Sequence, residues 1–159
     1  MVRFGPPRSP VPMIYETPPP IAFSVPRYAL SATERETVAA CLVLEAANQG
    51  DFGMRSVMAV IRNRARNQPE LFAPTVLRAK QFSAFNKLTA GRETLAHAIA
   101  RAKRDAMWPA AITIVGDALG DEWQDPTDGA THYTRTGERT PWTRTLAKTV
   151  TIGGHAFYR

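Results

Sequence analysis

The sequence predicts an α+β fold, in which a helical body precedes a small antiparallel sheet. Three observations point to this class. Apolar residues recur at helical spacing over about residues 31–119, turn-forming residues cluster at 125–129, and two short β-type segments flank Gly153-Gly154. The length of 159 residues suits one domain with an appended segment, so we expect an arm over residues 1–30 and a single domain over 31–159.

The N-terminal arm is expected to be extended, because eight of the thirteen prolines fall within it. They are Pro6, Pro7, Pro10, Pro12, Pro18, Pro19, Pro20 and Pro26. Proline fixes φ and removes a backbone donor, which favours polyproline II over a helix or a central strand. The arm also carries apolar residues such as Phe4, Ile14 and Phe23. Two interpretations stay open: a disordered tail, or a segment that docks on its own domain, on a second copy or on a partner's surface.

Helical structure is expected to begin at Ser31, since Ser31 and Glu34 have the spacing of a capping box. Val38, Cys41, Leu42 and Glu45 then follow at helical spacing, up to a stop near Asn48–Gly50. The same periodicity predicts a helix over about 53–67, a short one over 74–79, a long one over 93–107 and a short one over 109–119.

Strand structure is expected after Gly120. The run Asp125-Pro126-Thr127-Asp128-Gly129 is typical of a turn, and 130–134 has β character. Segments 149–152 and 155–158 flank Gly153-Gly154, which predicts a two-residue hairpin.

Composition limits the function classes. The single cysteine excludes an intrachain disulfide framework, and no apolar run approaches the roughly 18–20 residues that would span a bilayer. A net charge of +6 favours anionic surroundings. The arginines are scattered, however, and no recognition motif accompanies them, so we expect neither nucleic-acid binding nor membrane insertion. No secretory signal is evident in the first residues.

Glu45 is the first candidate for chemistry. It ends a mostly apolar helix, after Leu42-Val43-Leu44 and before Ala46-Ala47, so we expect partial burial, which favours the neutral form of a carboxyl group. A protonated glutamate near neutral pH can act as a general acid. A solvated surface charge is the alternative interpretation of the position by itself.

Four ordered motifs carry a resemblance to a known family. They are Leu42-Val-Leu-Glu45-Ala46 followed by Gly53 and Val57-Met-Ala-Val-Ile-Arg-Asn63-Arg64; Gln81-Phe82-Ser83; Asp125-Pro-Thr-Asp-Gly129-Ala-Thr-His132-Tyr133; and Pro141-Trp142 with Ile152-Gly-Gly-His155-Ala-Phe157-Tyr158-Arg159. In this order, over about residues 38–159, they resemble the catalytic domain of the SleB-type cell-wall hydrolases.

The resemblance implies a lysozyme-like α+β domain that acts on peptidoglycan glycan strands and needs no cofactor. It implies a lytic transglycosylase that cleaves between N-acetylmuramic acid and N-acetylglucosamine and leaves a 1,6-anhydro product, with Glu45 at the position of the catalytic glutamate. The missing secretory signal, the small size and the Pro-rich arm further suggest a phage endolysin or a virion-associated lysin, found in a host cytoplasm or a virion.

The same motifs nominate substrate-binding residues. Gln81 and Ser83 are expected to line a groove, His132 to orient Glu45 or bind sugar, and Tyr133 and Trp142 to stack on sugar rings. Thr131 belongs to the same predicted strand. For each, a structural role is the alternative. Asn63-Arg64 is expected to tie the second helix to the one that carries Glu45, and His155 to be structural.

The chain departs from the family pattern at one place. After the catalytic Glu-Ala pair the family continues Arg-Gly-Glu, whereas this chain has Ala47-Asn48-Gln49. An amide thus replaces an acid, which argues against a water-activating mechanism. The departure also keeps open a weakly active or non-catalytic wall-binding or virion structural module. A metal-dependent amidase or endopeptidase, using Cys41, His132, His155 and Asp125 or Asp128, is a further alternative without a supporting ligand motif.

Overall fold

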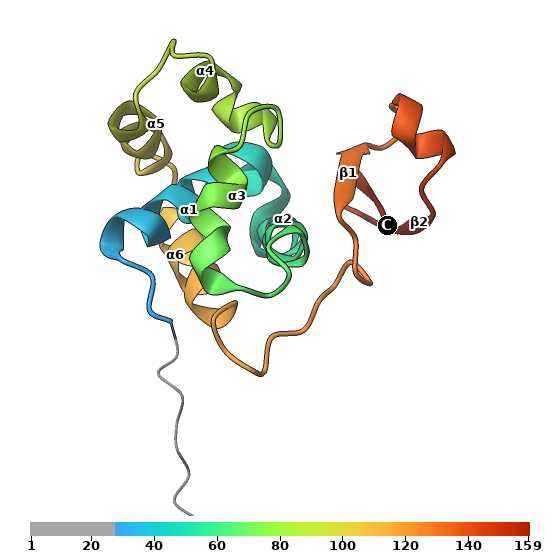
Figure 1. The fold of residues 1–159 in the computed structure, drawn as a ribbon, viewed down its shortest axis with the longest axis horizontal. Coiled ribbons are helices and arrows are strands. Elements are labelled where there is room, and N and C mark those ends of the chain that lie inside the picture. The colour runs from blue at the N-terminus through green and yellow to red at the C-terminus, as the bar shows by residue number, and fades with distance from the viewer. Residues whose placement is uncertain (1–27) are drawn as a thin grey trace, which may run out of the picture.

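The structure, a computed structural model, describes residues 28–159 and shows two parts, a helical body and a small sheet beside it (Figure 1). The predicted α+β class is therefore confirmed. The arm expected over residues 1–30 lies, except for its last three residues, outside the described residues. Leu30, one of those three, is buried in the main core.

Helix α1 (Ala32–Ala46) forms the centre of the helical body. The predicted capping box is present: the Ser31 hydroxyl accepts from the Glu34 N–H at 3.2 Å, and the Glu34 carboxylate accepts from the Ser31 N–H at 2.8 Å. Most of the helix is buried, including Val38, Cys41 and Leu42. A helix buried on most sides has little freedom to shift, so Glu45 in its last turn is held in a fixed place.

The remaining helices pack around α1. They are the 3₁₀ turn η1 (Ala47–Gln49), α2 (Gly50–Arg64), η2 (Pro69–Leu71), α3 (Phe72–Leu77), η3 (Ser83–Phe85), α4 (Asn86–Thr89), α5 (Leu95–Ala102) and α6 (Trp108–Asp117). The helix predicted over 93–107 is shorter than expected. It ends at Ala102 because the Asp105 side chain accepts from the Met107 N–H at 2.8 Å, forming a turn before Pro109 opens α6.

The sheet has three strands, β1 (His132–Arg135), β2 (Lys148–Ile152) and β3 (His155–Tyr158), in the order β1-β3-β2. All neighbours are antiparallel, and β2 and β3 meet at the predicted Gly153-Gly154 turn. The short helix η4 (Pro141–Arg144) lies in the connection between β1 and β2. The last strand in the chain is thus the central strand of the sheet.

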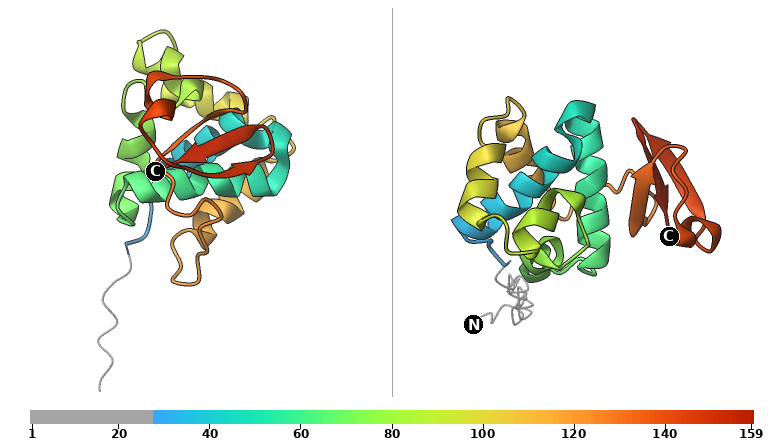
Figure 2. Two further views of the ribbon diagram at one scale, coloured as in Figure 1. Left: turned by 90° about the vertical axis from the view of Figure 1, so that its right-hand side faces the viewer. Right: turned by 90° about the horizontal axis from the view of Figure 1, so that it is seen from above.

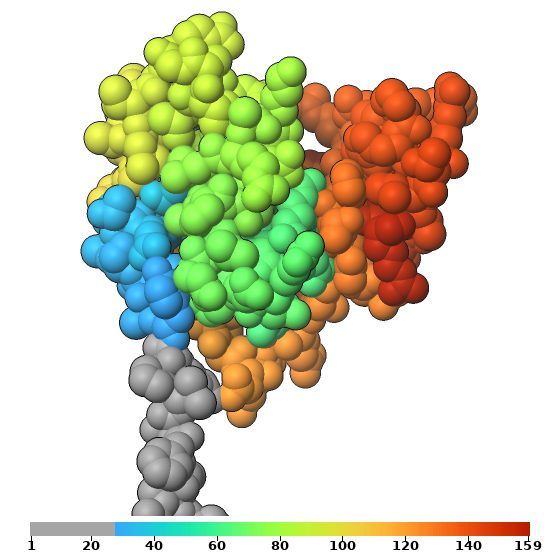
Figure 3. Space-filling view, in the orientation of Figure 1, coloured from blue at the N-terminus to red at the C-terminus, as the bar shows by residue number. Residues whose placement is uncertain are grey.

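The sheet packs on α2 through a small core of its own. Val60 of α2 joins Ala130, Ile152 and Phe157 in this cluster, separately from the main core around α1. Figure 2 shows the sheet standing against α2, and the space-filling view shows a hollow between the sheet and residues near 80 (Figure 3). Within residues 28–159, no helix is both long and apolar enough to cross a membrane.

Candidate active site

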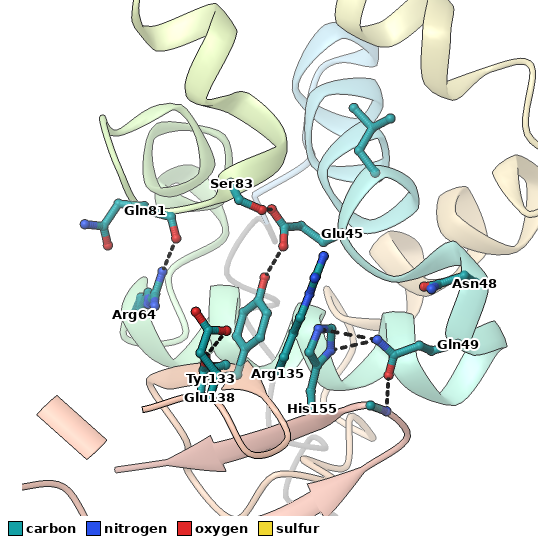
Figure 4. Close-up of a pocket in the computed structure, with 13 residues that line it drawn as sticks. Glu45, Asn48, Gln49, Arg64, Gln81, Ser83, Tyr133, Arg135, Glu138 and His155 are labelled. Atoms are coloured by element: carbon teal, nitrogen blue, oxygen red, sulfur yellow. Dashed lines mark hydrogen bonds between the residues drawn. The ribbon is translucent and has the colours of Figure 1, made fainter. Parts of the chain in front are cut away.

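The end of α1 opens into a cavity of about 790 Å³ between the helical body and the sheet. Glu45 lines it from α1, Gln81 and Ser83 from the loop before and the start of η3, and Tyr133 and His155 from the sheet. Figure 4 shows the Ser83 side chain from the helical body and the Tyr133 side chain from the sheet pointing at Glu45, whereas the Gln81 side chain extends away from it. Four predicted site residues, Glu45, Gln81, Ser83 and Tyr133, are therefore brought together.

The Glu45 carboxylate is half-buried and accepts three hydrogen bonds (Figure 4). Its Oε1 atom accepts from the Ser83 hydroxyl at 3.0 Å and from the Ala84 N–H at 2.6 Å. Its Oε2 atom accepts from the Tyr133 hydroxyl at 2.7 Å. Two of the donors come from the helical body and one from the sheet, so the carboxylate is held across the cavity.

The Tyr133 hydroxyl keeps its proton and so remains a hydrogen-bond donor. Burial, followed by the nearby negative charge of Glu45, raises the pKa of Tyr133 well above 10. The centroid of its ring lies 5.0 Å from that of the His155 ring and 5.6 Å from that of the Phe157 ring. These aromatic contacts fix the direction of the phenol, which points at Glu45.

Arg64 supports the same wall from behind. Its guanidinium donates to the carbonyl oxygens of Thr131 at 2.6 Å and Gln81 at 3.1 Å, and lies over the Phe82 ring. Burial lowers the pKa of Arg64. The group thus joins the loop carrying Ser83 to the strand carrying Tyr133.

The prediction that Asn63-Arg64 ties α2 to α1 is wrong, because the pair binds a different segment of the chain. Asn63 donates to the Asp125 carboxylate and to the Ala130 carbonyl oxygen, both at 2.9 Å. The pair instead joins α2 to the chain that leads into β1, because the ends of α2 and β1 lie side by side.

Gln49 connects the two parts at the other end of the cavity. Its carbonyl oxygen accepts from the Gly154 N–H at 2.9 Å, and its amide nitrogen lies 3.0 Å from Nδ1 of His155. The same nitrogen lies 3.4 Å from Nε2 of the ring. An amide nitrogen can only donate, so the ring nitrogen that it meets accepts and the His155 ring is neutral. Burial, opposed by Glu45 and aided by Arg135, lowers the pKa of His155, which agrees with this state.

Two glycines make room for Gln49. A Cβ atom on Gly53 would stand 2.5 Å from the Gln49 Cβ, and one on Gly153 would meet the Gln49 carbonyl oxygen. Gly153 also has a φ of +56°, which side-chain-bearing residues rarely adopt. The glycines therefore permit the close approach of η1 to the hairpin.

Three predicted residues do not line this cavity: Thr131, His132 and Trp142. Neighbouring residues of a strand point to opposite faces, so Tyr133 faces the helices while His132 faces away. The His132 ring packs on the Trp142 ring with their centroids 5.1 Å apart, and the Trp142 ring packs on the Tyr158 ring with their centroids 5.3 Å apart. The prediction that His132 orients Glu45 is accordingly wrong. Trp142 packs with His132 and Tyr158 in an aromatic cluster outside the cavity. Burial and the charge of Arg64 lower the pKa of His132.

The alternative metal site is not assembled. Cys41 is fully buried in the main core, where burial raises the pKa of its thiol. Across residues 28–159, no three His, Cys, Asp or Glu side chains lie close enough to hold a metal ion together.

Sequence reasoning missed several lining residues, among them Glu138. This residue lines the same cavity and accepts from the Thr134 hydroxyl at 2.8 Å. It lies outside the quoted motifs, and only the return of the chain after β1 brings it here. The Ala84 N–H could not be found either, because a backbone donor leaves no mark in the sequence.

A carboxylate held by three donors at the wall of a polar cavity is an arrangement that can serve general acid–base chemistry. The cell wall hydrolase family matches residues 48–158, so this chain belongs to that family. The expected enzyme class is thereby confirmed at family level. The matched segment begins at Asn48, after Glu45, so the role of that residue depends on the geometry described above.

Two solved structures are similar. The catalytic domain of the germination-specific lytic transglycosylase SleB from Bacillus anthracis has a TM-score of 0.59 at 22% identity, covering 82% of this chain and 97% of that one. The catalytic domain of SleB from Bacillus cereus gives 0.60 at 22%, covering 82% and 93%. These likenesses show the fold. Comparison with the curated proteins finds no match.

Proposed function

We propose that this protein is a peptidoglycan lytic transglycosylase in which Glu45 acts as general acid and then as general base. The observation that supports this most strongly is the Glu45 carboxylate, held by Ser83, Ala84 and Tyr133 at the wall of a cavity of about 790 Å³. The similarity in fold to the SleB lytic transglycosylase domains supports it further.

The hydrogen bonds identify the oxygen that would carry the proton. Oε1 accepts from the Ala84 N–H, which can never accept, and from the Ser83 hydroxyl. Oε2 faces only the Tyr133 hydroxyl, and a phenol can accept as well as donate. The proton of neutral Glu45 therefore resides on Oε2.

The reaction then follows in two steps. Oε2–H protonates the bridging glycosidic oxygen while the bond from that oxygen to C1 of N-acetylmuramic acid breaks, through an oxocarbenium-like transition state. The C6 hydroxyl of the same sugar attacks C1, and its proton passes to the Glu45 carboxylate, which restores the acid. No water enters, and Tyr133 stabilises the carboxylate between the steps.

A hydrolytic outcome is a second candidate, favoured by Glu138 on the same cavity wall. A second carboxylate could activate water on the other face of the sugar. The products separate the two reactions, because a 1,6-anhydro fragment is lighter by one water than a reducing fragment.

The test is digestion of purified sacculi, with the soluble fragments identified by mass. We expect anhydro-muropeptides from the native protein and at least about 100-fold less release from Glu45→Gln. Glu70→Gln, which changes an exposed carboxylate away from the cavity, is the matched control and should retain full release. Free peptides would indicate an amidase, and no release a wall-binding module.

Delivery is a separate proposal, that of a phage endolysin or a virion-associated lysin, with residues 31–159 as the catalytic domain. The Pro-rich composition of residues 1–26 supports it, since such segments are common in recognition and attachment. Mass spectrometry of purified particles tests it: presence there supports a virion lysin, and absence an endolysin.

A further inference from the structure

The cavity at Glu45 continues into a second one of about 530 Å³. Both are lined by Leu44, Glu45, Asn48 and Arg135. The two cavities therefore form one groove that passes Glu45 and runs over the end of α1. We call the second part, beside the end of α5, the arginine branch.

Three guanidinium groups line the arginine branch, and two of them are unpaired. Arg101 pairs with Glu93 at 3.2 Å. Arg104, in the turn after α5, and Arg135, in β1, have no carboxylate partner among residues 28–159. Figure 4 shows the Arg135 side chain extending from the sheet toward the end of α1.

The carboxylates beside these arginines are already engaged. Asp105 accepts from the Met107 N–H at 2.8 Å, and Glu45 accepts its three hydrogen bonds from other groups. Arg104 and Arg135 therefore present unused donors on two sides of the branch. A guanidinium group binds a carboxylate through two parallel hydrogen bonds, so the ligand chemistry that fits is anionic and rich in carboxylates.

We propose that the arginine branch binds the carboxylates of the peptide stem of peptidoglycan, so that the enzyme prefers glycan strands that carry peptides. The proposal rests on the proposed function. The stem is attached to the muramic ring whose C1 bond would be broken at Glu45, so it leaves the glycan within a few ångströms of that residue. The branch adjoining Glu45 is thus where a stem carboxylate would lie.

The experiment compares initial rates of glycan release from intact sacculi and from sacculi stripped of peptides by an amidase. The measured quantity is the ratio of the two rates. For the native protein we expect a ratio above one that falls with added salt, because exposed charge pairs are screened. Arg104→Ala should reduce the ratio by about 2–5-fold, and Arg104→Glu by more.

Arg92→Ala, which removes an exposed arginine outside both cavities, is the matched control and should keep the native ratio. Thermal unfolding verifies that each variant is folded. Unchanged ratios in both Arg104 variants, or equal losses on the two substrates, would overturn the inference. A native protein that cleaves stripped strands as fast as intact ones overturns the inference alone, whereas one that cleaves neither overturns the proposed function as well.

Discussion

Tyr133 is the donor that the sheet contributes to Glu45, and at the scale of single residues it separates two kinds of role. Ser83 and Ala84 hold Oε1, which the proposed reaction leaves unchanged. Tyr133 holds Oε2, which the proton would leave and re-enter. A change at Tyr133 should therefore affect the rate more than the fold.

Tyr133→Phe keeps the ring that packs on His155 and Phe157 and removes only the hydroxyl. We expect release from sacculi to fall by about 10–100-fold, since one charge-assisted hydrogen bond is lost. Initial rates of release from sacculi test this, and thermal unfolding verifies that the variant is folded. A normal rate in a folded variant would remove Tyr133 from the mechanism.

Gln49→Glu replaces the amide with the acid of the family pattern. A carboxylate cannot donate to Nδ1 of His155, so the ring must take a proton to keep the contact. The pKa of His155, now lowered, should rise above 6.5 in the variant. The contact between protonated His155 and the new carboxylate should stabilise the folded variant. This stabilisation is complete below the pKa of His155 in the unfolded chain and is lost as pH rises through its pKa in the folded chain. Titration of the ring by NMR measures the change; a pKa that stays below 6.5 would contradict it.

The catalytic candidate could be predicted from the sequence, and its partners only in part. Glu45 ends an apolar helix, a local feature that is visible in the chain. Its bond with Tyr133 joins residues 88 positions apart and depends on how the sheet packs on α2. The strand pattern could not say which of His132 and Tyr133 faces inward, because both are aromatic and a shift of one residue exchanges the faces.

The β2–β3 hairpin is the element that joins the sheet to η1. Gly153→Ala would place a methyl group against the Gln49 carbonyl oxygen, at a backbone angle that is already unfavourable for alanine. We expect a lower free energy of unfolding and slower release. Gly137→Ala is the matched control. Gly137 has a φ of +87°, but a Cβ atom added there would have no other atom within 4 Å. It should lose only the backbone penalty of about 1–2 kcal/mol. Equal losses in urea unfolding would show that the contact with Gln49 is unimportant.

Elements with local signals were predictable. The capping box at Ser31 and the Gly153-Gly154 turn are encoded by neighbours in sequence, and both are present. The end of α5 was not, because Lys103–Met107 continues a helical pattern that only the Asp105 side chain interrupts. The predicted start of α2 at Gly53 was likewise three residues late, since η1 leads directly into Gly50.

Asp125 links the helical body to the sheet at the scale of the whole molecule. It accepts from Asn63 of α2 and from Thr127 and Gly129 in the loop before β1. Burial acts to raise the pKa of Asp125, but these hydrogen bonds outweigh it and the pKa is lowered. The resulting stability is complete above the unfolded value of 3.8 and is lost as pH falls through the folded value.

Asp125→Asn should therefore destabilise the protein by about 1–2 kcal/mol at pH 7. The difference from the native protein should stay constant down to about pH 5 and shrink toward pH 3. Asp128→Asn, in the same turn but exposed, is the control and should show a smaller effect. Thermal unfolding at each pH measures both. A difference that grows as pH falls would contradict the assignment.

The strand order bears on when a newly made molecule could begin to cut. Because β3 lies between β1 and β2, neither outer strand has a partner until residues 155–158 exist. A ribosome that has already produced Glu45, Ser83 and Tyr133 has therefore not yet produced a working groove. Polypeptides that stop short of residue 155 should be harmless to the wall, and the enzyme would become competent only once β3 has folded between the two outer strands.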